Sequence, residues 1–368
     1  MTELATKSKI FNAKKGMVAK RRFRKKINPP MVILHLFINT NAAYAKQYDY
    51  IVEDGNRVPI PLTYTVKDVI TLAGESKGLM LAEDLFIDKN DIIYVADTGN
   101  NRIIKMDSEG MVLDYYTGPE ERPFKSPKGV YVDNYGHIFV ADTGNRRIVH
   151  LAPDGRYIEE FVRPVSELLD EHFTFEPSKV YVSPTGYIYT MKGQQLLMMD
   201  AQNTFRGFIG AAEVGFDLTS VLIRMFASKE QKERIARRMP PPYINFTAGP
   251  DEMIYAVTLD YNGGQIKKLN SVGKNILKKQ PFGEQRDDKG EHIKPIFSDI
   301  TVDHNGIITV VKERTCKIYQ YDQEGNLLTV FGGKGTRKGY FQKPSAIDVD
   351  SRGNIYVLDM NANSIQVF

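Results

Sequence analysis

One residue pattern recurs six times in this sequence. Each copy has a short run of β-forming residues, a turn residue, and an aromatic residue or Thr six positions after that turn residue. Successive turn residues lie 45, 50, 66, 54 and 47 residues apart. The six turn residues are Asp88, Asp133, Ser183, Gly249, Asp303 and Asp350. A period near 45 residues with several strands in each unit is typical of a β-propeller, so we predict an all-β fold with six blades.

The second copy is the clearest example of a four-stranded unit. Its predicted strands cover 129–132, 137–142, 147–151 and 157–162, with a turn at Asp154-Gly155. The sixth copy ends after its third strand, at 364–368. The segment 66–72 precedes the first copy as a fourth strand would, so we expect it to complete the sixth blade and close the ring.

Two of the copies resemble the NHL repeat. The matching segments are Val95-Ala-Asp-Thr-Gly-Asn-Asn-Arg-Ile103 and Val140-Ala-Asp-Thr-Gly-Asn-Arg-Arg-Ile148. The similarity extends over residues 66–368, although the other four copies depart from the motif; the fifth has Lys312-Glu-Arg-Thr315 in its place. The resemblance implies a six-bladed propeller similar to exported bacterial NHL-repeat proteins.

The motif loops carry the candidate ligand or partner residues. These are Asp97, Asn100 and Arg102 in the first copy, and Asp142, Asn145 and Arg147 in the second. The favoured interpretation is structural: the Asp accepts loop N–H groups and the Arg pairs with or packs on a neighbouring segment. The alternative is that these loops line a ligand-binding face, to which Arg102 and Arg147 contribute if their side chains face outward.

The fourth copy is preceded by an insertion at about 211–242. Its apolar residues recur at helical spacing, which predicts a helix from Phe216 to Phe226. A second, charged turn or helix is expected from Ser228 to Arg238, ended by three consecutive prolines. Packing on the rim is the favoured interpretation. A lid or docking helix on the same face as the motif loops is the alternative, and it adds Phe216 and Phe226 to the candidate partner residues.

Metal and nucleophile motifs are sparse. Cys316 is the only cysteine, which excludes an intramolecular disulfide and a cysteine-based zinc cluster. Six-bladed lactonases and related hydrolases hold a calcium ion at the channel mouth, and the residues here that would correspond are Glu83, Asp84 and Asp299. These acids are weak candidates, so no cofactor is predicted and calcium stays an open alternative.

The N-terminal segment differs from the rest of the chain. Residues 1–45 hold ten Lys or Arg and one acid, then an apolar run and Ala43-Tyr44-Ala45. This order predicts a secretory signal, with Met1 or Met17 as the start, and an extracytoplasmic protein. Residues 46–65 lead into the propeller. Contact with a membrane is expected only through an uncleaved signal.

The net charge of residues 46–368 helps to choose between possible functions. Residues 46–368 hold 39 basic and 44 acidic residues, a net charge of −5, which disfavours nucleic-acid binding, including the RNA binding known among NHL propellers. We therefore expect an exported module that holds a protein, peptide or glycan on one propeller face, with a carbohydrate-related role suggested by resemblance. A lactonase- or lyase-like hydrolase is the alternative, and catalytic residues stay unknown.

Overall fold

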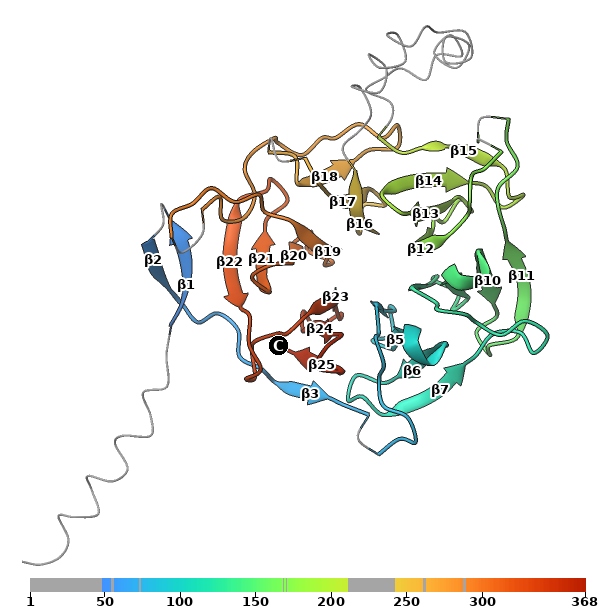
Figure 1. The fold of residues 1–368 in the computed structure, drawn as a ribbon, viewed down its shortest axis with the longest axis horizontal. Helices are drawn as coiled ribbons and strands as arrows, with labels where there is room; N and C mark the ends of the chain where they lie inside the picture. Colours follow the sequence, from blue (N-terminus) through green and yellow to red (C-terminus); the bar gives the residue numbers. More distant parts are fainter. Residues whose placement is uncertain are drawn as a thin grey trace, which may run out of the picture. The chain divides into compact units, whose positions relative to one another are not determined.

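Six small sheets surround a common centre (Figure 1). The computed structural model describes residues 48–368 apart from 54–55, 73, 168, 170, 211–241, 261–262 and 287–288, and all of these belong to the unit Gln47–Phe368. Each sheet is a blade whose first strand lies nearest the centre. Among the described residues, five blades have four strands and one has three. The predicted all-β, six-bladed propeller is confirmed.

The first three blades follow each other along the chain, and every blade is an antiparallel meander. Their strands are β4 (Asp84–Ile87), β5 (Ile93–Asp97), β6 (Arg102–Met106) and β7 (Val112–Tyr116); β8 (Gly129–Val132), β9 (Ile138–Asp142), β10 (Arg147–Leu151) and β11 (Tyr157–Phe161); and β12 (Pro177–Val182), β13 (Ile188–Lys192), β14 (Gln195–Met199) and β15 (Phe205–Phe208). Single 3-10 turns, η1 (Thr98–Asn100) and η2 (Thr143–Asn145), join the second and third strands of blades 1 and 2.

Blades 4 to 6 complete the ring. Their strands are β16 (Tyr243–Ala248), β17 (Ile254–Thr258) and β18 (Ile266–Leu269); β19 (Phe297–Val302), β20 (Ile308–Lys312), β21 (Lys317–Tyr321) and β22 (Leu327–Gly332); and β23 (Pro344–Val349), β24 (Ile355–Asp359), β25 (Ser364–Val367) and β3 (Asp68–Ile70). Within the described ranges, blade 4 lacks a fourth strand. The second and third strands of blade 2 match the predicted ranges to within one residue.

The recurring turn acid folds the chain back between the first two strands of a blade. In blade 1, the Asp88 carboxylate accepts the backbone N–H groups of Asn90 and Ile92, at 2.8 and 3.0 Å. Asp133, Asp303 and Asp350 accept the corresponding pairs of N–H groups in blades 2, 5 and 6. An aspartate at this place satisfies the turn's donors locally, which explains why the sequence repeats it.

The hydrophobic core is divided among the blade interfaces. Residues from blade 6 and blade 1 form one cluster that includes Ile70, Leu85 and Leu358, and five similar clusters lie between the other neighbouring blades. The second strands β5 and β9 are buried along their whole length, whereas the fourth strands β7 and β11 of the same blades carry exposed residues. Each blade therefore depends on two neighbours to cover its faces.

The predicted ring closure involves a shorter strand than the sequence indicated. β3 pairs antiparallel with β25, with Ile70 opposite Ile365 and Asp68 opposite Val367. The N–H of Lys67 also donates to the carbonyl oxygen of Val367 at 2.7 Å. This N-terminal strand occupies the fourth position of blade 6 and covers the edge of β25.

The segment before β3 forms a hairpin that the sequence did not predict. Its strands β1 (Tyr48–Glu53) and β2 (Asn56–Pro61) pair with each other, and Ile51 and Ile60 pack against the core between blades 4 and 5. The predicted signal at 1–45 and the predicted helix at 216–226 lie outside the described residues. No helix in the described ranges is long and apolar enough to cross a membrane.

We predict that closure depends on β3 and not on the hairpin. A chain starting at residue 62 keeps β3 and should stay monomeric, with a modestly lower melting temperature. A chain starting at residue 74 leaves β25 unpaired and should aggregate or unfold, because an open strand edge recruits other strands. Light scattering and thermal melts compare the two; equal behaviour of both chains would contradict this account of closure.

Candidate functional site

The motif loop of blade 1 folds around a buried carboxylate. Asp97 accepts the N–H of Met80 at 2.8 Å through Oδ1, which ties the loop to the connection that enters the blade. Through Oδ2 it accepts Asn100 Nδ2 at 2.8 Å and Arg102 Nε at 2.7 Å. Arg102 then donates from Nη2 to the carbonyl oxygen of Lys77 at 2.8 Å. The hydrogen bonds made by Asp97 and Arg102 thus hold together the loop, the incoming connection and the third strand. We call this carboxylate–guanidinium pair and its hydrogen bonds the clasp.

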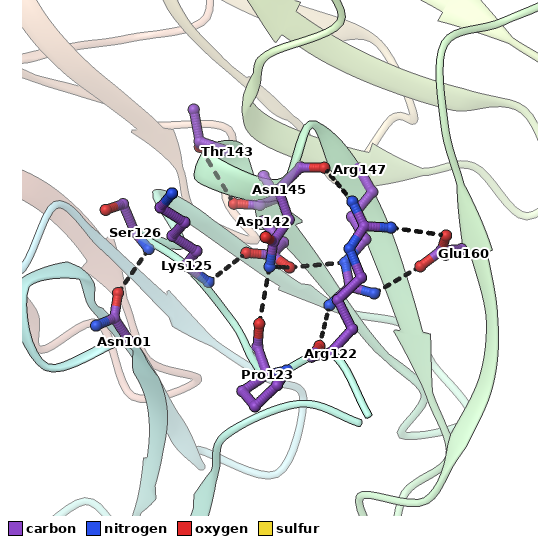
Figure 2. Close-up of polar contacts among 11 residues, drawn as sticks. Asn101, Arg122, Pro123, Lys125, Ser126, Asp142, Thr143, Asn145, Arg147 and Glu160 are labelled. Carbon is purple, nitrogen blue, oxygen red and sulfur yellow. Dashed lines mark hydrogen bonds and ion pairs between the residues drawn. The ribbon is translucent and has the colours of Figure 1, made fainter. Parts of the chain in front are cut away.

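Blade 2 repeats this clasp with an added ion pair (Figure 2). Asp142 accepts Lys125 N at 2.7 Å, Asn145 Nδ2 at 2.8 Å and Arg147 Nε at 2.7 Å. Arg147 also pairs through Nη1 with Glu160 at 2.6 Å, and donates to the carbonyl oxygen of Arg122.

The carboxylate and guanidinium groups of these loops are buried. Asp97 and Asp142 are fully buried, and Arg102 and Arg147 are only 8% and 1% exposed. The arginine side chains do not face outward, so they are not placed to contact a ligand at this face. The clasp fits the structural interpretation that the sequence favoured. Phe216 and Phe226, which were placed on the same face, lie outside the described residues.

A different set of side chains meets at the centre of the ring. In every blade, the residue four positions before the turn residue lies on the innermost strand and points to the same side as the residue two positions before it. The residues four positions before the turn are Asp84, Gly129, Lys179, Asn245, Asp299 and Ala346. We call the four polar members, Asp84, Lys179, Asn245 and Asp299, the polar ring.

The polar ring is cross-linked between blades. Lys179 Nζ lies 2.5 Å from Asp84 Oδ1, and Asp84 Oδ2 accepts the N–H of Val130 at 3.0 Å. Asp299 accepts Asn245 Nδ2 at 2.7 Å and the N–H of Ile347 at 2.8 Å. Three of these bonds join consecutive blades and the Lys179–Asp84 pair joins blades 3 and 1, and together they satisfy the buried carboxylate oxygens.

The ammonium group of Lys179 and several buried carboxyl groups shift each other's pKa values in and beside the polar ring. Burial raises the pKa of Asp299 to about 7. The attraction of Lys179 lowers this pKa, and the repulsion from Asp84 raises it further. Burial likewise raises the pKa of Asp348 to about 6, although hydrogen bonds from Thr301 and from the N–H of Ile87 oppose the increase. The pKa of Lys179 is raised, because the attraction of these acids exceeds the cost of its burial.

The weak calcium candidates do not form a metal site. Glu83 pairs with Lys128 at 3.1 Å, Asp84 is held by Lys179, and Asp299 by Asn245. No cluster of three or more His, Cys, Asp or Glu side chains that could hold a metal ion occurs in the described part of the chain. A calcium ion needs six to eight oxygen ligands. The Lys179 ammonium instead provides the positive charge beside Asp84, so these residues do not fit the metal.

The polar ring separates two openings of the central channel. On the side of the motif loops, a cavity of about 210 Å³ is lined by Glu83, Asp84, Lys179 and Asn245 among others. On the side of the turns that follow the innermost strands lies a larger cavity of about 560 Å³, which we call the turn-side vestibule. Lys179 lines both cavities. All six blades contribute their innermost strands to the vestibule wall.

The vestibule has two unlike walls. Its inward side chains, two positions before each turn residue, are Phe86, Tyr131, Tyr181, Thr247, Thr301 and Asp348 in blade order. Blades 1 to 3 therefore contribute aromatic rings, and blades 4 to 6 contribute hydroxyl and carboxyl groups. Tyr135, which is 85% exposed, and Glu252 stand at the rim.

Sequence reasoning missed most of these residues. It singled out Asp84 and Asp299 but not Lys179, Tyr181 or Asp348. A signal was present: Asp348 and Lys179 are charged residues within otherwise apolar first strands. Comparing the positions four and two before the turn across all copies would have identified both layers.

We predict that the clasp stabilises the fold. Arg147→Met leaves Asp142 buried without its cationic partner and should lower the free energy of unfolding by about 3–5 kcal/mol. Arg156→Met is the control, because that side chain is 76% exposed and should change little. Denaturant unfolding measures both variants. Equal stability of the two would refute the structural role.

We also predict a pH dependence from the polar ring. Asp299 has a pKa of about 7 in the folded state against 3.8 for an ordinary aspartate, so the folded state binds its proton more tightly. Its contribution to stability should therefore fall as pH rises from about 4 to 7. Asp299→Asn should flatten this part of the unfolding free energy profile, whereas the exposed Asp154→Asn should not. An unchanged profile in Asp299→Asn would contradict the assignment.

Comparisons with known proteins identify one repeat family and several solved structures. The NHL repeat model matches residues 124–151 and 341–368, which lie in blades 2 and 6. No curated protein sequence matches the chain. The chain is similar to the solved structure of virginiamycin B lyase from Staphylococcus aureus, with 15% identity, 87% of each chain covered and a TM-score of 0.49.

Two further solved structures show comparable similarity. A streptogramin B lyase has 12% identity and a TM-score of 0.48, with 82% of this chain and 96% of that chain covered. The WD40 propeller domain of Doa1 has 11% identity and a TM-score of 0.48, with 87% and 88% covered. From the repeat matches and the six sheets, the chain is a six-bladed β-propeller built with NHL repeats.

Proposed function

We propose that this protein is an exported binding module that holds a hydroxyl-rich ligand, a glycan or its terminal sugar, in the turn-side vestibule. The observation that carries the proposal is the division of that cavity into an aromatic wall and a hydroxyl and carboxyl wall. A sugar ring has the matching chemistry, because its C–H face packs on aromatic rings while its hydroxyl groups make hydrogen bonds.

The aromatic wall is continuous across three blades. The rings of Phe86 and Tyr131 lie 5.1 Å apart, and those of Tyr131 and Tyr181 lie 5.2 Å apart, both in edge-to-face contact. Within the described residues, neither the Tyr131 nor the Tyr181 hydroxyl has a hydrogen-bond partner. Mutual packing fixes the rings before a ligand arrives, which lowers the entropy cost of binding.

The opposite wall supplies fixed hydrogen-bonding groups. Thr301 donates to Asp348 Oδ1 at 2.7 Å, and the N–H of Ile87 donates to Asp348 Oδ2 at 2.8 Å. These bonds hold the carboxyl group in place beside the cavity, where it can accept further bonds from ligand hydroxyls. Thr247 adds another hydroxyl from blade 4.

This proposal places the ligand on the face opposite the motif loops. The loop residues named from the sequence are held in the buried clasp, whereas polar and aromatic side chains line the vestibule. Export remains part of the proposal because of the basic, apolar and Ala-Tyr-Ala order of residues 1–45. A hydrolase with a channel-mouth metal is not favoured, because the acids there are paired with Lys179, Lys128 and Asn245.

We predict that binding depends on both walls. A glycan array identifies a ligand, and titration calorimetry then compares Tyr181→Leu and Asp348→Asn with the native protein. Each variant should weaken binding by about tenfold or more, because each removes a group that the ligand contacts directly. Tyr157→Leu is the matched control, since this tyrosine is exposed on the outermost strand of blade 2.

Two results would contradict the proposal. One is a glycan affinity that stays the same in both vestibule variants. The other is capture of peptides, but of no glycan, by the native protein, which would favour a peptide-binding module. Melting temperatures of all variants are recorded alongside, so that a loss of binding is separated from a loss of fold.

A further inference from the structure

The fifth blade keeps the motif-loop backbone but changes its side chains. Residues 312–317 occupy the place that 97–102 occupy in blade 1, between the second and third strands. Cys316 has a φ of 54°, and Asn101 at the equivalent place has a φ of 56°, so the left-handed turn residue is retained. The clasp Asp and Arg of blade 1 are replaced by Lys312 and Lys317.

The changed loop leaves room for a cavity. In blade 1 a side chain at Gly99 would lie 2.7 Å from the carbonyl oxygen of Met80, and in blade 2 one at Gly144 would lie 2.5 Å from that of Lys125. The incoming connection therefore lies directly on those loops. Blade 5 has Arg314 at this position, exposed to solvent. Beside it is a cavity of about 340 Å³, which we call the blade 5 pocket.

The blade 5 pocket is positively charged. Its lining includes Arg314, Lys317 and Lys334, with Glu284 as the acidic member. Glu284 is already held by two ammonium groups, Lys312 at 3.0 Å and Lys317 at 2.7 Å, and their attraction lowers the pKa of this carboxyl despite its burial. Among the residues that the structure describes, Arg314 and Lys334 have no acidic partner.

Uncharged groups complete the pocket. Thr315 is one of the residues that line the pocket, and its hydroxyl oxygen is buried without a hydrogen-bond partner in the described part of the chain. A buried hydroxyl without a partner is costly, so a ligand that accepts its proton would be stabilised. Tyr50 and Tyr340 form aromatic sides, with the Lys317 ammonium 4.2 Å from the centre of the Tyr50 ring.

We propose that the blade 5 pocket binds the phosphate group of a small phosphorylated molecule. Arg314, Lys317 and Lys334 supply three cations and Thr315 a hydroxyl donor, which suits a dianion with three acceptor oxygens better than a carboxylate with two. Lys317 donates to Glu284 and to the carbonyl oxygen of Tyr50 and lies against the Tyr50 ring, so its part in binding is the positive charge that it places in the pocket wall. The organic part of the ligand then packs against Tyr50 and Tyr340.

The test is titration of the full chain with phenyl phosphate, inorganic phosphate and benzoate at low ionic strength. Phenyl phosphate should bind, and its affinity should rise between pH 5 and pH 7 as the second phosphate proton is lost near pH 6. Arg314→Gln and Lys334→Gln should each weaken binding by about tenfold or more, and Thr315→Val by a smaller factor. Benzoate should bind much more weakly.

Matched controls separate this site from general charge effects and from the turn-side vestibule. Arg156→Gln removes an exposed arginine from blade 2, and Asp348→Asn alters the vestibule; both should leave phosphate affinity unchanged. Inorganic phosphate that binds as tightly as phenyl phosphate, with loss in the same variants, would support a phosphate site and identify the free anion as the ligand. Absence of phosphate binding, or equal weakening in Arg156→Gln, would overturn the proposal.

Discussion

Packing between neighbouring blades is the constraint on which the rest of the structure depends. A single blade buries its second strand only if another blade covers each face, and the six clusters of apolar residues lie at these interfaces. The chain must therefore close on itself. β3 completes the blade that contains β25, which places residues from both ends of the propeller in one sheet and one core cluster.

Closure brings six equivalent strand positions to one axis, and their side chains decide the chemistry there. The acids Asp84, Asp299 and Asp348 share the field of one cation, Lys179, and burial raises the pKa of Asp299 and Asp348. Carboxylates that are held by hydrogen bonds in this way keep fixed positions. The side chains two positions before each turn residue, one from each blade, likewise form the walls of the turn-side vestibule. One half of this wall is aromatic and the other half is polar.

The motif loop shows how one backbone serves two purposes. In blades 1 and 2 a carboxylate and a guanidinium clasp the incoming connection, and glycine permits its close approach. In blade 5 both of these loop positions are lysines, and the carboxylate, that of Glu284, comes from the connection. The fold is kept: the connection still contacts the loop through Glu284 and through the carbonyl oxygen of Ile296, which accepts the N–H of Glu313 at 3.0 Å, and the blade 5 pocket lies beside this contact. A departure from a repeat is therefore where a new site arises in this protein.

The sequence by itself determined the repeat, the number of blades, the turn chemistry and the closing segment, because these follow from local periodicity and from aspartates that bond to their own turns. It also favoured the structural role of Asp97 and Arg102. It did not reveal that Lys179 lies against Asp84, or that Glu284 lies between Lys312 and Lys317. Such pairs join residues 28 to 95 positions apart. Only the closed ring sets their distance and burial, and these determine charge and ligand chemistry.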